Sequence, residues 1–192
     1  MRSTLHHTLL TLALLSGSAY AAQPAATAPV SDVQAAQQAI AAFAASLQGE
    51  LKQAIAAGGP VRAVEVCHTQ AQKLAAEASA QHGLQISRVS TRNRNPNNAP
   101  NEWQATVLAS FEARKAAGEP VAQLSYSETV TTAAGSQVRF MKAIPTAELC
   151  VVCHGAVIAP ELEARLKQLY PADKARGFNV GDIRGAFVVT RP

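Results

Sequence analysis

Aromatic residues are scarce in this chain of 192 residues: they make up 5% of it and include one tryptophan. Hydrophobic residues reach 48%, but many of them are alanines, which bury little surface per residue. Charged residues account for 16%, a balance typical of a globular protein rather than a disordered one. The side chains alone therefore supply a thin core, to which a bulky buried cofactor would add apolar surface.

The chain also lacks a basic stripe. Its formal net charge is +4, and its basic residues are scattered apart from Arg88, Arg92 and Arg94. Nucleic-acid-binding proteins usually carry a clustered basic face or a recognisable module, so we expect no nucleic-acid partner. A weakly basic surface can still steer an acidic redox partner protein.

No hydrophobic run is long enough to cross a bilayer, which takes about 20 residues. The longest one near the start, Leu9–Leu15, follows Arg2 and precedes Ala19-Tyr20-Ala21. A basic start, a short apolar run and a small-x-small site are typical of a cleaved signal peptide. The sequence therefore predicts a signal peptide over 1–21, no stable membrane span, and a mature protein in the periplasm.

The rest of the chain divides into an Ala- and Pro-rich flexible leader over 22–30 and one domain over 31–192. Within the domain, helical patterns come first and strand-like patterns mostly follow, with Gly58-Gly59-Pro60 separating the first two helices. This order predicts an α+β domain with an antiparallel sheet of about five strands and N-terminal helices. Helices are expected over 32–57, 62–81, 102–117 and 160–170, and strands over 84–90, 121–130, 137–144 and 183–190.

The most specific motif is Cys150-Val151-Val152-Cys153-His154, which has the Cys-x-x-Cys-His pattern of c-type haem attachment. Two thiols spaced in this way add to the haem vinyl groups as thioethers. The histidine that follows directly reaches the iron as its proximal ligand. We therefore expect one covalent haem c, held by Cys150, Cys153 and His154.

Other interpretations of the motif fit less well. A thioredoxin-like Cys-x-x-Cys belongs to a parallel βαβ pattern, which the predicted element order does not contain. A zinc site needs a second pair of ligands at a suitable spacing, and the chain offers only single residues. A disulfide between Cys150 and Cys153 would leave His154 without a purpose.

The iron needs a second axial ligand, and Cys67 is the leading candidate. It is the third cysteine of an exported protein, which indicates either intermolecular pairing or a specific use. Val64, Cys67, Ala71, Leu74 and Ala78 recur at steps of three and four, so Cys67 is predicted to face inward. The alternative is that Cys67 is a small buried hydrophobe.

Three further residues compete with Cys67. Met141, in the strand predicted over 137–144, is an alternative ligand that would raise the reduction potential, although a methionine there also suits a core. His68 lies about 100° around the helix from Cys67, and His82 stands at a helix end, where a histidine interacts with the helix dipole.

Three segments carry a family resemblance: Ala63-Val64-Glu65-Val66-Cys67, the run from Arg88 to Pro100 with its Arg-Asn-Pro-x-Asn core, and Trp103. Together with the late Cys-x-x-Cys-His motif, they resemble the PAS-like single-haem c redox-sensor domains, a family with a cyanobacterial type member. The resemblance implies a PAS-like α+β fold packed around the haem. It also implies iron ligation by His154 and Cys67.

The arginines of the loop that follows Arg88 are candidates for the haem propionates. Guanidinium groups suit carboxylates, so Arg88, Arg92 and Arg94 are expected either to pair with the propionates or to face water. Trp103 is predicted to serve ordinary helix packing.

Three functions fit these residues. The first is redox sensing or electron transfer by the haem. The second is binding of a small gas, CO or NO, at an iron from which Cys67 can be displaced. The third is a peroxidase-like enzyme, for which the only acid–base candidate is His68 beside Glu65. Because that pair makes no convincing catalytic set, we expect that the protein is not an enzyme.

Overall fold

The computed structural model describes residues 26–133 and 135–191. The signal peptide predicted over 1–21 and the start of the leader lie outside these residues. The helices of the described part are α1 Val30–Thr69, α2 Ala71–His82, α3 Glu102–Ala116, α4 Glu148–His154 and α5 Pro160–Leu169. The strands are β1 Gln85–Val89, β2 Ser125–Thr132, β3 Gly135–Pro145 and β4 Ile183–Arg191.

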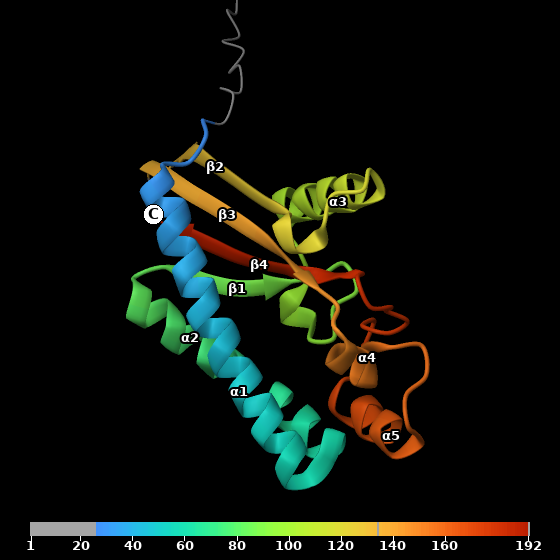
Figure 1. Ribbon diagram of the computed structural model, residues 1–192. Helices are drawn as coiled ribbons and strands as arrows, with labels where there is room; N and C mark the ends of the chain where they lie inside the picture. The colour runs from blue at the N-terminus through green and yellow to red at the C-terminus, as the bar shows by residue number, and fades with distance from the viewer. Residues whose placement is uncertain (1–25, 134, 192) are drawn as a thin grey trace, which may run out of the picture.

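The strands form one antiparallel sheet in the order β1-β4-β3-β2 (Figure 1). The α+β class is confirmed, but the described residues form four strands where about five were predicted. Each of the four strand-like runs forms one strand. The strand predicted from residue 121 begins later, because Val121–Gln123 forms a 3-10 turn ahead of β2. The haem motif, for which no element was predicted, forms the short helix α4.

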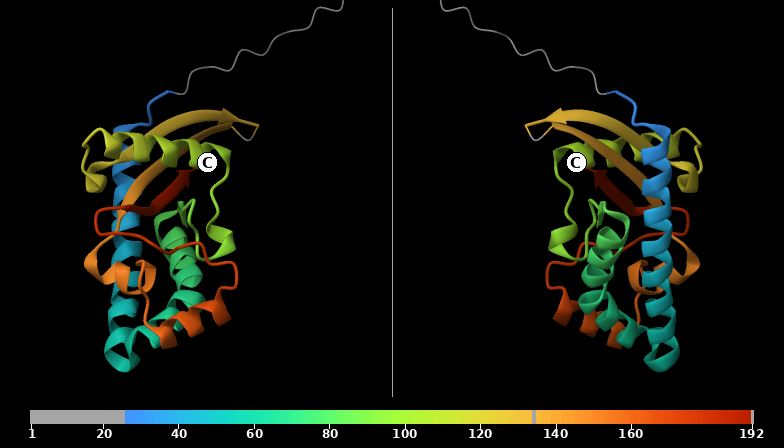
Figure 2. Two further views of the ribbon diagram at one scale, coloured as in Figure 1. Left: turned by 90° about the vertical axis from the view of Figure 1, so that its right-hand side faces the viewer. Right: turned by 90° about the vertical axis from the view of Figure 1, so that its left-hand side faces the viewer.

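Helices cover both faces of the sheet (Figures 1 and 2). On one face, α3 contributes Val107, Leu108 and Phe111 to a core that includes Met141 of β3 and Val188 of β4. On the other face, α1 and α2 pack over β1, β3 and β4. That second cluster includes Ala36, Ile40, Phe43, Ala78, Ile86, Phe140 and Val189.

The predicted break between the first two helices is confirmed inside α1. Gly58 and Gly59 leave helical geometry there, and Gly59 has φ 71° and ψ −172°, a region that is essentially restricted to glycine. After Pro60 the helix resumes and continues to Thr69. The predicted helix over 62–81 is therefore two helices, because Gln70 interrupts it before α2.

Two helix ends follow the sequence signals. Asn101 caps α3 in a capping box, in which its side chain accepts a hydrogen bond from the Gln104 amide and the Gln104 side chain accepts one from the Asn101 amide. Gly83 ends α2 with φ 62°.

In the described part of the chain, no helix combines the length and the apolar character that a membrane crossing needs.

A third cluster lies where the end of α1 meets α4 and α5. Val64 of α1 packs there with Leu162 and Leu166 of α5 and with Tyr170, and Cys153 of α4 packs against them. The third cluster brings the two cysteine-bearing helices together.

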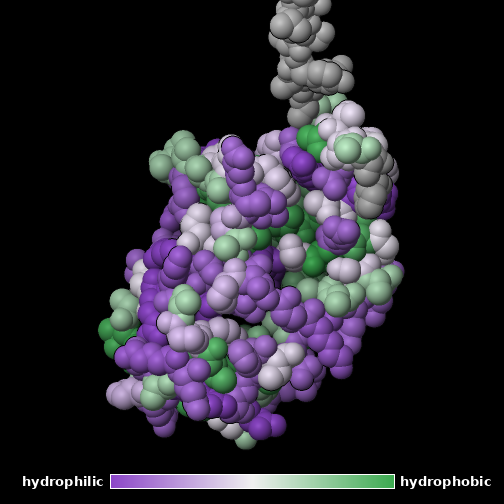
Figure 3. Space-filling model, turned by 180° about the vertical axis from the view of Figure 1, so that it is seen from behind, coloured by the Kyte–Doolittle hydropathy of each residue, from purple (hydrophilic) through white to green (hydrophobic). Residues whose placement is uncertain are grey.

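Seen from behind, the upper half of the molecule shows gathered hydrophobic residues, whereas hydrophilic residues dominate the lower half (Figure 3).

Candidate haem site

Helix α4 carries the whole Cys-x-x-Cys-His motif. Cys150 and Cys153 are three residues apart in this helix, which places their side chains on one helix face. Both thiols are free, as is Cys67, so no disulfide joins any two of the three cysteines. The arrangement leaves two adjacent thiols available to attach a ligand.

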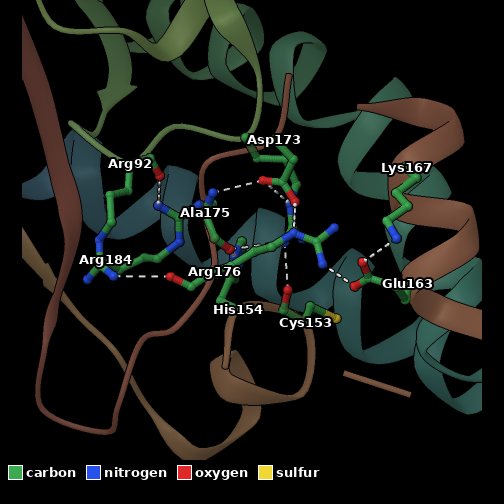
Figure 4. Close-up of polar contacts among 10 residues, drawn as sticks. Arg92, Cys153, His154, Glu163, Lys167, Asp173, Ala175, Arg176 and Arg184 are labelled. Carbon is green, nitrogen blue, oxygen red and sulfur yellow. Dashed lines mark hydrogen bonds and ion pairs between the residues drawn. The ribbon is translucent and has the colours of Figure 1, made fainter. Parts of the chain in front are cut away.

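The imidazole of His154 is fixed by a hydrogen bond on one of its two nitrogens. Nδ1 lies 2.9 Å from the Ala175 carbonyl oxygen (Figure 4), and because a carbonyl only accepts, Nδ1 carries the proton. This tautomer leaves the lone pair of Nε2 available for a metal. The backbone holds the same segment, since the Phe178 amide donates to the His154 carbonyl at 2.9 Å.

The surroundings of His154 favour its neutral form. Burial lowers its pKa well below the usual value, and the positive charges of Arg184 and Arg94 lower it further. Phe178 packs edge-on to the imidazole, with ring centroids 6.2 Å apart. A neutral imidazole is the form that ligates a metal.

Arg94 connects the asparagine-rich loop to the haem motif. Its side chain is 9% exposed and pairs with Asp173, with Nε 3.2 Å from Oδ1. Its Nη2 donates to the carbonyl oxygens of Cys153 at 2.6 Å and Ala175 at 3.2 Å. The carbonyl that holds His154 is therefore itself held by Arg94.

The network around Asp173 extends to α5. Asp173 also accepts hydrogen bonds from the Ala175 amide at 2.9 Å and from Arg176 Nε at 3.1 Å. Arg176 pairs in turn with Glu163 of α5, which is also 3.1 Å from Lys167 (Figure 4). These ion pairs connect the loop at Arg94, the segment 173–176 and α5 to one another.

Cys67 lies in the last turn of α1, three residues after Val64, which packs against α5. It is half-buried and stands one turn after the buried Val64, which confirms the predicted inward orientation. Burial raises the pKa of the Cys67 thiol, while the charges of Arg88, Arg94 and Arg184 oppose this shift. Burial likewise raises the pKa of the Cys153 thiol, a shift that the charge of Arg94 opposes and the charges of Cys67 and Cys150 increase.

These donors fit a haem c. Two free thiols share one face of α4, the tautomer of His154 keeps a lone pair on Nε2, and Cys67 stands on another helix. Within residues 26–133 and 135–191, no three His, Cys, Asp or Glu side chains converge as the ligands of a bare metal ion would. An iron already held by a porphyrin needs only two axial protein ligands.

The comparisons with known proteins agree with this fit. The family model described as Tll0287-like matches residues 23–192. The chain belongs to the Tll0287-like family. It is also similar to the crystal structure of the cyanobacterial heme-protein Tll0287, with 25% sequence identity and a TM-score of 0.64 over 86% of this chain and 97% of that one. Among curated proteins no match is found.

The rival ligands of this Tll0287-like chain take three different positions. Met141 is fully buried in the core under α3, opposite Val188 in the sheet register. His68 is exposed and meets Tyr170 edge-on at 5.1 Å, and His82 is the last residue of α2. The structure therefore brings Cys67, and not Met141, into the neighbourhood of the haem motif.

The acid–base candidate of a peroxidase is engaged elsewhere. Glu65 Oε1 lies 2.7 Å from Arg165 Nη2 in an ion pair between α1 and α5.

Trp103 packs against the core under α3, with the Arg139 guanidinium 5.0 Å from its ring centroid. This contact confirms the packing role predicted for Trp103.

The three arginines predicted from the sequence take different positions. Arg94 is buried in the network described above. Arg92 is exposed, donates to the carbonyl oxygens of Arg176 at 3.1 Å and Gly177 at 3.5 Å, and lies 3.6 Å above the Phe178 ring. Arg88 of β1 is half-buried and is near enough to Cys67 for the two charges to interact.

A fourth arginine was missed by the sequence reasoning. Arg184 of β4 lies 5.1 Å from the centroid of the Phe178 ring, on which Arg92 also packs. Burial is the main cause that lowers the pKa of His154, and the charge of Arg184 is the next. No sequence signal connects it to the site, because it stands 92 residues after Arg92 and reaches it only through the pairing of β1 with β4.

Proposed function

We propose that this chain is an exported single-haem c-type cytochrome, in which Cys150 and Cys153 form the thioethers and His154 and Cys67 are the axial ligands. The observation that carries the proposal is the tautomer of His154, which is held through Nδ1 beside two free thiols. Membership of the Tll0287-like family, which is named after a heme-protein, supports it. Such a centre acts in redox sensing or electron transfer.

A bound haem supplies an iron that accepts and releases one electron. The protein contributes the ligands and their electrostatics. Hydrogen bonding to the Ala175 carbonyl orients the His154 ring and makes it a stronger donor. Cys67 as a thiolate stabilises ferric over ferrous iron and so lowers the reduction potential, and the nearby arginines favour that anionic form.

Gas binding is the second candidate function. Cys67 stands on the part of α1 that follows the break at Gly58-Gly59-Pro60, separate from the part that packs on the sheet. If this segment moved on reduction, it would withdraw Cys67 without moving the part of α1 that packs on the sheet, and it would open a position for CO or NO. The PAS-like resemblance agrees with a sensor of this kind.

Export to the periplasm belongs to the same proposal. The signal-peptide pattern over 1–21 supports it, and the family match starts at residue 23, just after the predicted cleavage site. Attachment of haem to Cys-x-x-Cys-His is compatible with an oxidising compartment only while the two thiols are kept reduced. An acidic redox protein is the proposed partner, and no catalytic role is proposed.

Spectra of the purified ferric and ferrous protein test the ligand assignment. We expect low-spin ferric bands with thiolate character in the wild type and their loss in Cys67→Ala. The control His68→Ala changes the adjacent residue and should keep the bands. Wild-type bands in Cys67→Ala would contradict the assignment.

A further inference from the structure

Two arginines on neighbouring strands, Arg88 of β1 and Arg184 of β4, lie beside the candidate haem site. The start of β4 approaches the end of β1 closely, since a Cβ atom on Gly185 would stand 2.3 Å from the Val89 carbonyl oxygen. Only glycine permits this approach. The contact fixes Arg184 next to the strand that carries Arg88.

These two arginines are unusual in having no acidic partner. Both are half-buried, and within the described part of the chain neither has a carboxylate within ion-pair distance. The other described arginines that are not exposed all pair with an aspartate or a glutamate. They are Arg94, Arg114, Arg139, Arg165, Arg176 and Arg191.

Among the described residues, none of their direct contacts is with an anionic group. The Arg88 guanidinium lies 5.6 Å from the Phe43 ring centroid. Arg184 packs on Phe178, and its Nη1 is 3.4 Å from the Arg92 carbonyl oxygen. An aromatic face and one long backbone contact do not neutralise a buried cation, which normally has an anionic partner.

The two cations also destabilise each other. Burial lowers the pKa of Arg184 to about 10, and the charges of Arg94 and Arg88 add to the effect, whereas the charges of Asp173 and Cys150 oppose it. Burial likewise lowers the pKa of Arg88. Two like charges held together in this way favour a ligand that brings two negative groups to the same place.

We propose that Arg88 and Arg184 bind the two propionate carboxylates of the haem, an inference that rests on the proposed function. A porphyrin of this class carries two carboxylates on one rigid ring, and guanidinium forks match carboxylates in shape and charge. Arg94 already binds Asp173 and two carbonyl oxygens, so it acts as a positioning residue for α4. Arg92 braces Phe178 and the loop at Arg176 and Gly177.

The test uses the haem-loaded protein and single substitutions. Arg88→Gln and Arg184→Gln each remove one cation, and Arg88→Lys and Arg184→Lys keep the charge but not the fork. The control is Arg114→Gln, which also removes one positive charge. Arg114 belongs to α3, on the face of the sheet opposite to α1 and α2, and pairs with Glu119. For each protein, haem content, midpoint potential and the propionate bending modes in resonance Raman spectra are measured.

Both glutamine variants are expected to have a lower midpoint potential than the wild type and shifted propionate modes, because a cation that favours the ferrous state is lost. The lysine variants should keep the potential but show shifted modes, and the control should change neither. If a glutamine variant loads no haem, the corresponding lysine variant decides through its propionate modes. Wild-type modes in the lysine variants, or wild-type potentials and modes in the glutamine variants, would overturn the proposal.

The failure of this inference differs from the failure of the proposed function. A wild-type protein without covalent haem would refute the proposed function before any arginine is changed. A haem-loaded wild type whose arginine variants match the Arg114→Gln control would refute the propionate assignment alone.

Discussion

At the scale of single residues, the ion pair of Arg94 with Asp173 is the most deeply buried ion pair of the site. The two side chains are 9% and 3% exposed, so neither charge is compensated by water. Arg94 also donates to the carbonyl oxygens on both sides of the His154 anchor. The pair therefore supports both the stability of the fold and the position of His154.

Removing one partner should leave the other charge buried and unpaired. We expect Arg94→Gln to lower the free energy of unfolding by about 3–5 kcal/mol, measured by urea denaturation. Lys73→Gln is the control, because Lys73 pairs with Glu77 on the exposed surface of α2, where a pair contributes at most about 0.5 kcal/mol. Equal losses in the two variants would show that the Arg94 pair is not a structural centre.

The sequence pointed to several residues of the site but not to the residues that they contact. Cys67, Arg88 and Arg94 follow from the helical periodicity and from the loop motif. Asp173 and Arg184 do not, because pairs separated by 79 and 92 residues form only after the chain has folded. Residue type and spacing predict local chemistry, whereas partners depend on the fold.

At the scale of elements, the break in α1 separates the helix packed on the sheet from the segment that carries Cys67. Gly59 adopts a backbone conformation that only glycine adopts readily. Gly49, in contrast, stands within regular helix, with no atom within 4 Å of the position that a Cβ would take. The same substitution should therefore have opposite effects at the two sites.

We expect Gly59→Ala to lower the free energy of unfolding by about 1–3 kcal/mol through backbone strain. Gly49→Ala should raise it by about 0.5–1 kcal/mol, because alanine favours the helix. Urea denaturation of both variants beside the wild type measures the difference. A stabilising Gly59→Ala would mean that the break is not required by the fold.

A second element contact joins α3 to the turn before β4. Lys115 Nζ lies 2.8 Å from Asp182 Oδ1, and the Asn179 amide donates to the same carboxylate at 2.8 Å. The hydrogen bond from Lys115 is the main cause that lowers the pKa of Asp182, and the Asn179 amide lowers it further. Because the folded protein holds the ionised form, this carboxylate stabilises the fold above its unfolded pKa of about 3.9.

That stabilisation should disappear as the pH falls through the lowered pKa of Asp182. We expect Asp182→Asn to cost about 0.5–1.5 kcal/mol at pH 7 and progressively less below about pH 4. Denaturation at a series of pH values measures the loss, with the exposed Glu50→Gln as control. A loss that stays constant down to acidic pH would contradict the role given to the carboxylate.

The elements themselves were largely predictable from the sequence. The break at Gly58-Gly59-Pro60, the cap at Asn101 and the four strand runs are local signals, and each was found. Helix α4 was not predicted, because its seven residues are too short for a periodic pattern. The interruption at Gln70 has no glycine or proline to mark it.

At the scale of the whole molecule, the thin core leaves room for a contribution from the haem. The cluster at the junction of α1, α4 and α5 is the smallest of the three, and Cys153 lies against it. Leu149 and Val152 of α4 remain about 40% exposed. A covalently held porphyrin would add apolar surface at this end of the molecule.

The double variant Cys150→Ala/Cys153→Ala tests that contribution. Without its thioethers the protein should retain little haem, and a loss of about 2 kcal/mol would lower the melting temperature by about 4–8 °C. Circular dichroism follows the melting of both proteins. An unchanged melting temperature would show that the fold does not depend on the cofactor.

The central claim is that one haem is covalently attached through Cys150 and Cys153, and the intact mass of the protein tests it most directly. The chain is produced with its own N-terminus in a host that has a working c-type maturation system. The account predicts a coloured periplasmic protein whose mass equals that of the mature chain plus one haem, which denaturation does not remove. A colourless protein with the mass of the polypeptide alone would contradict it.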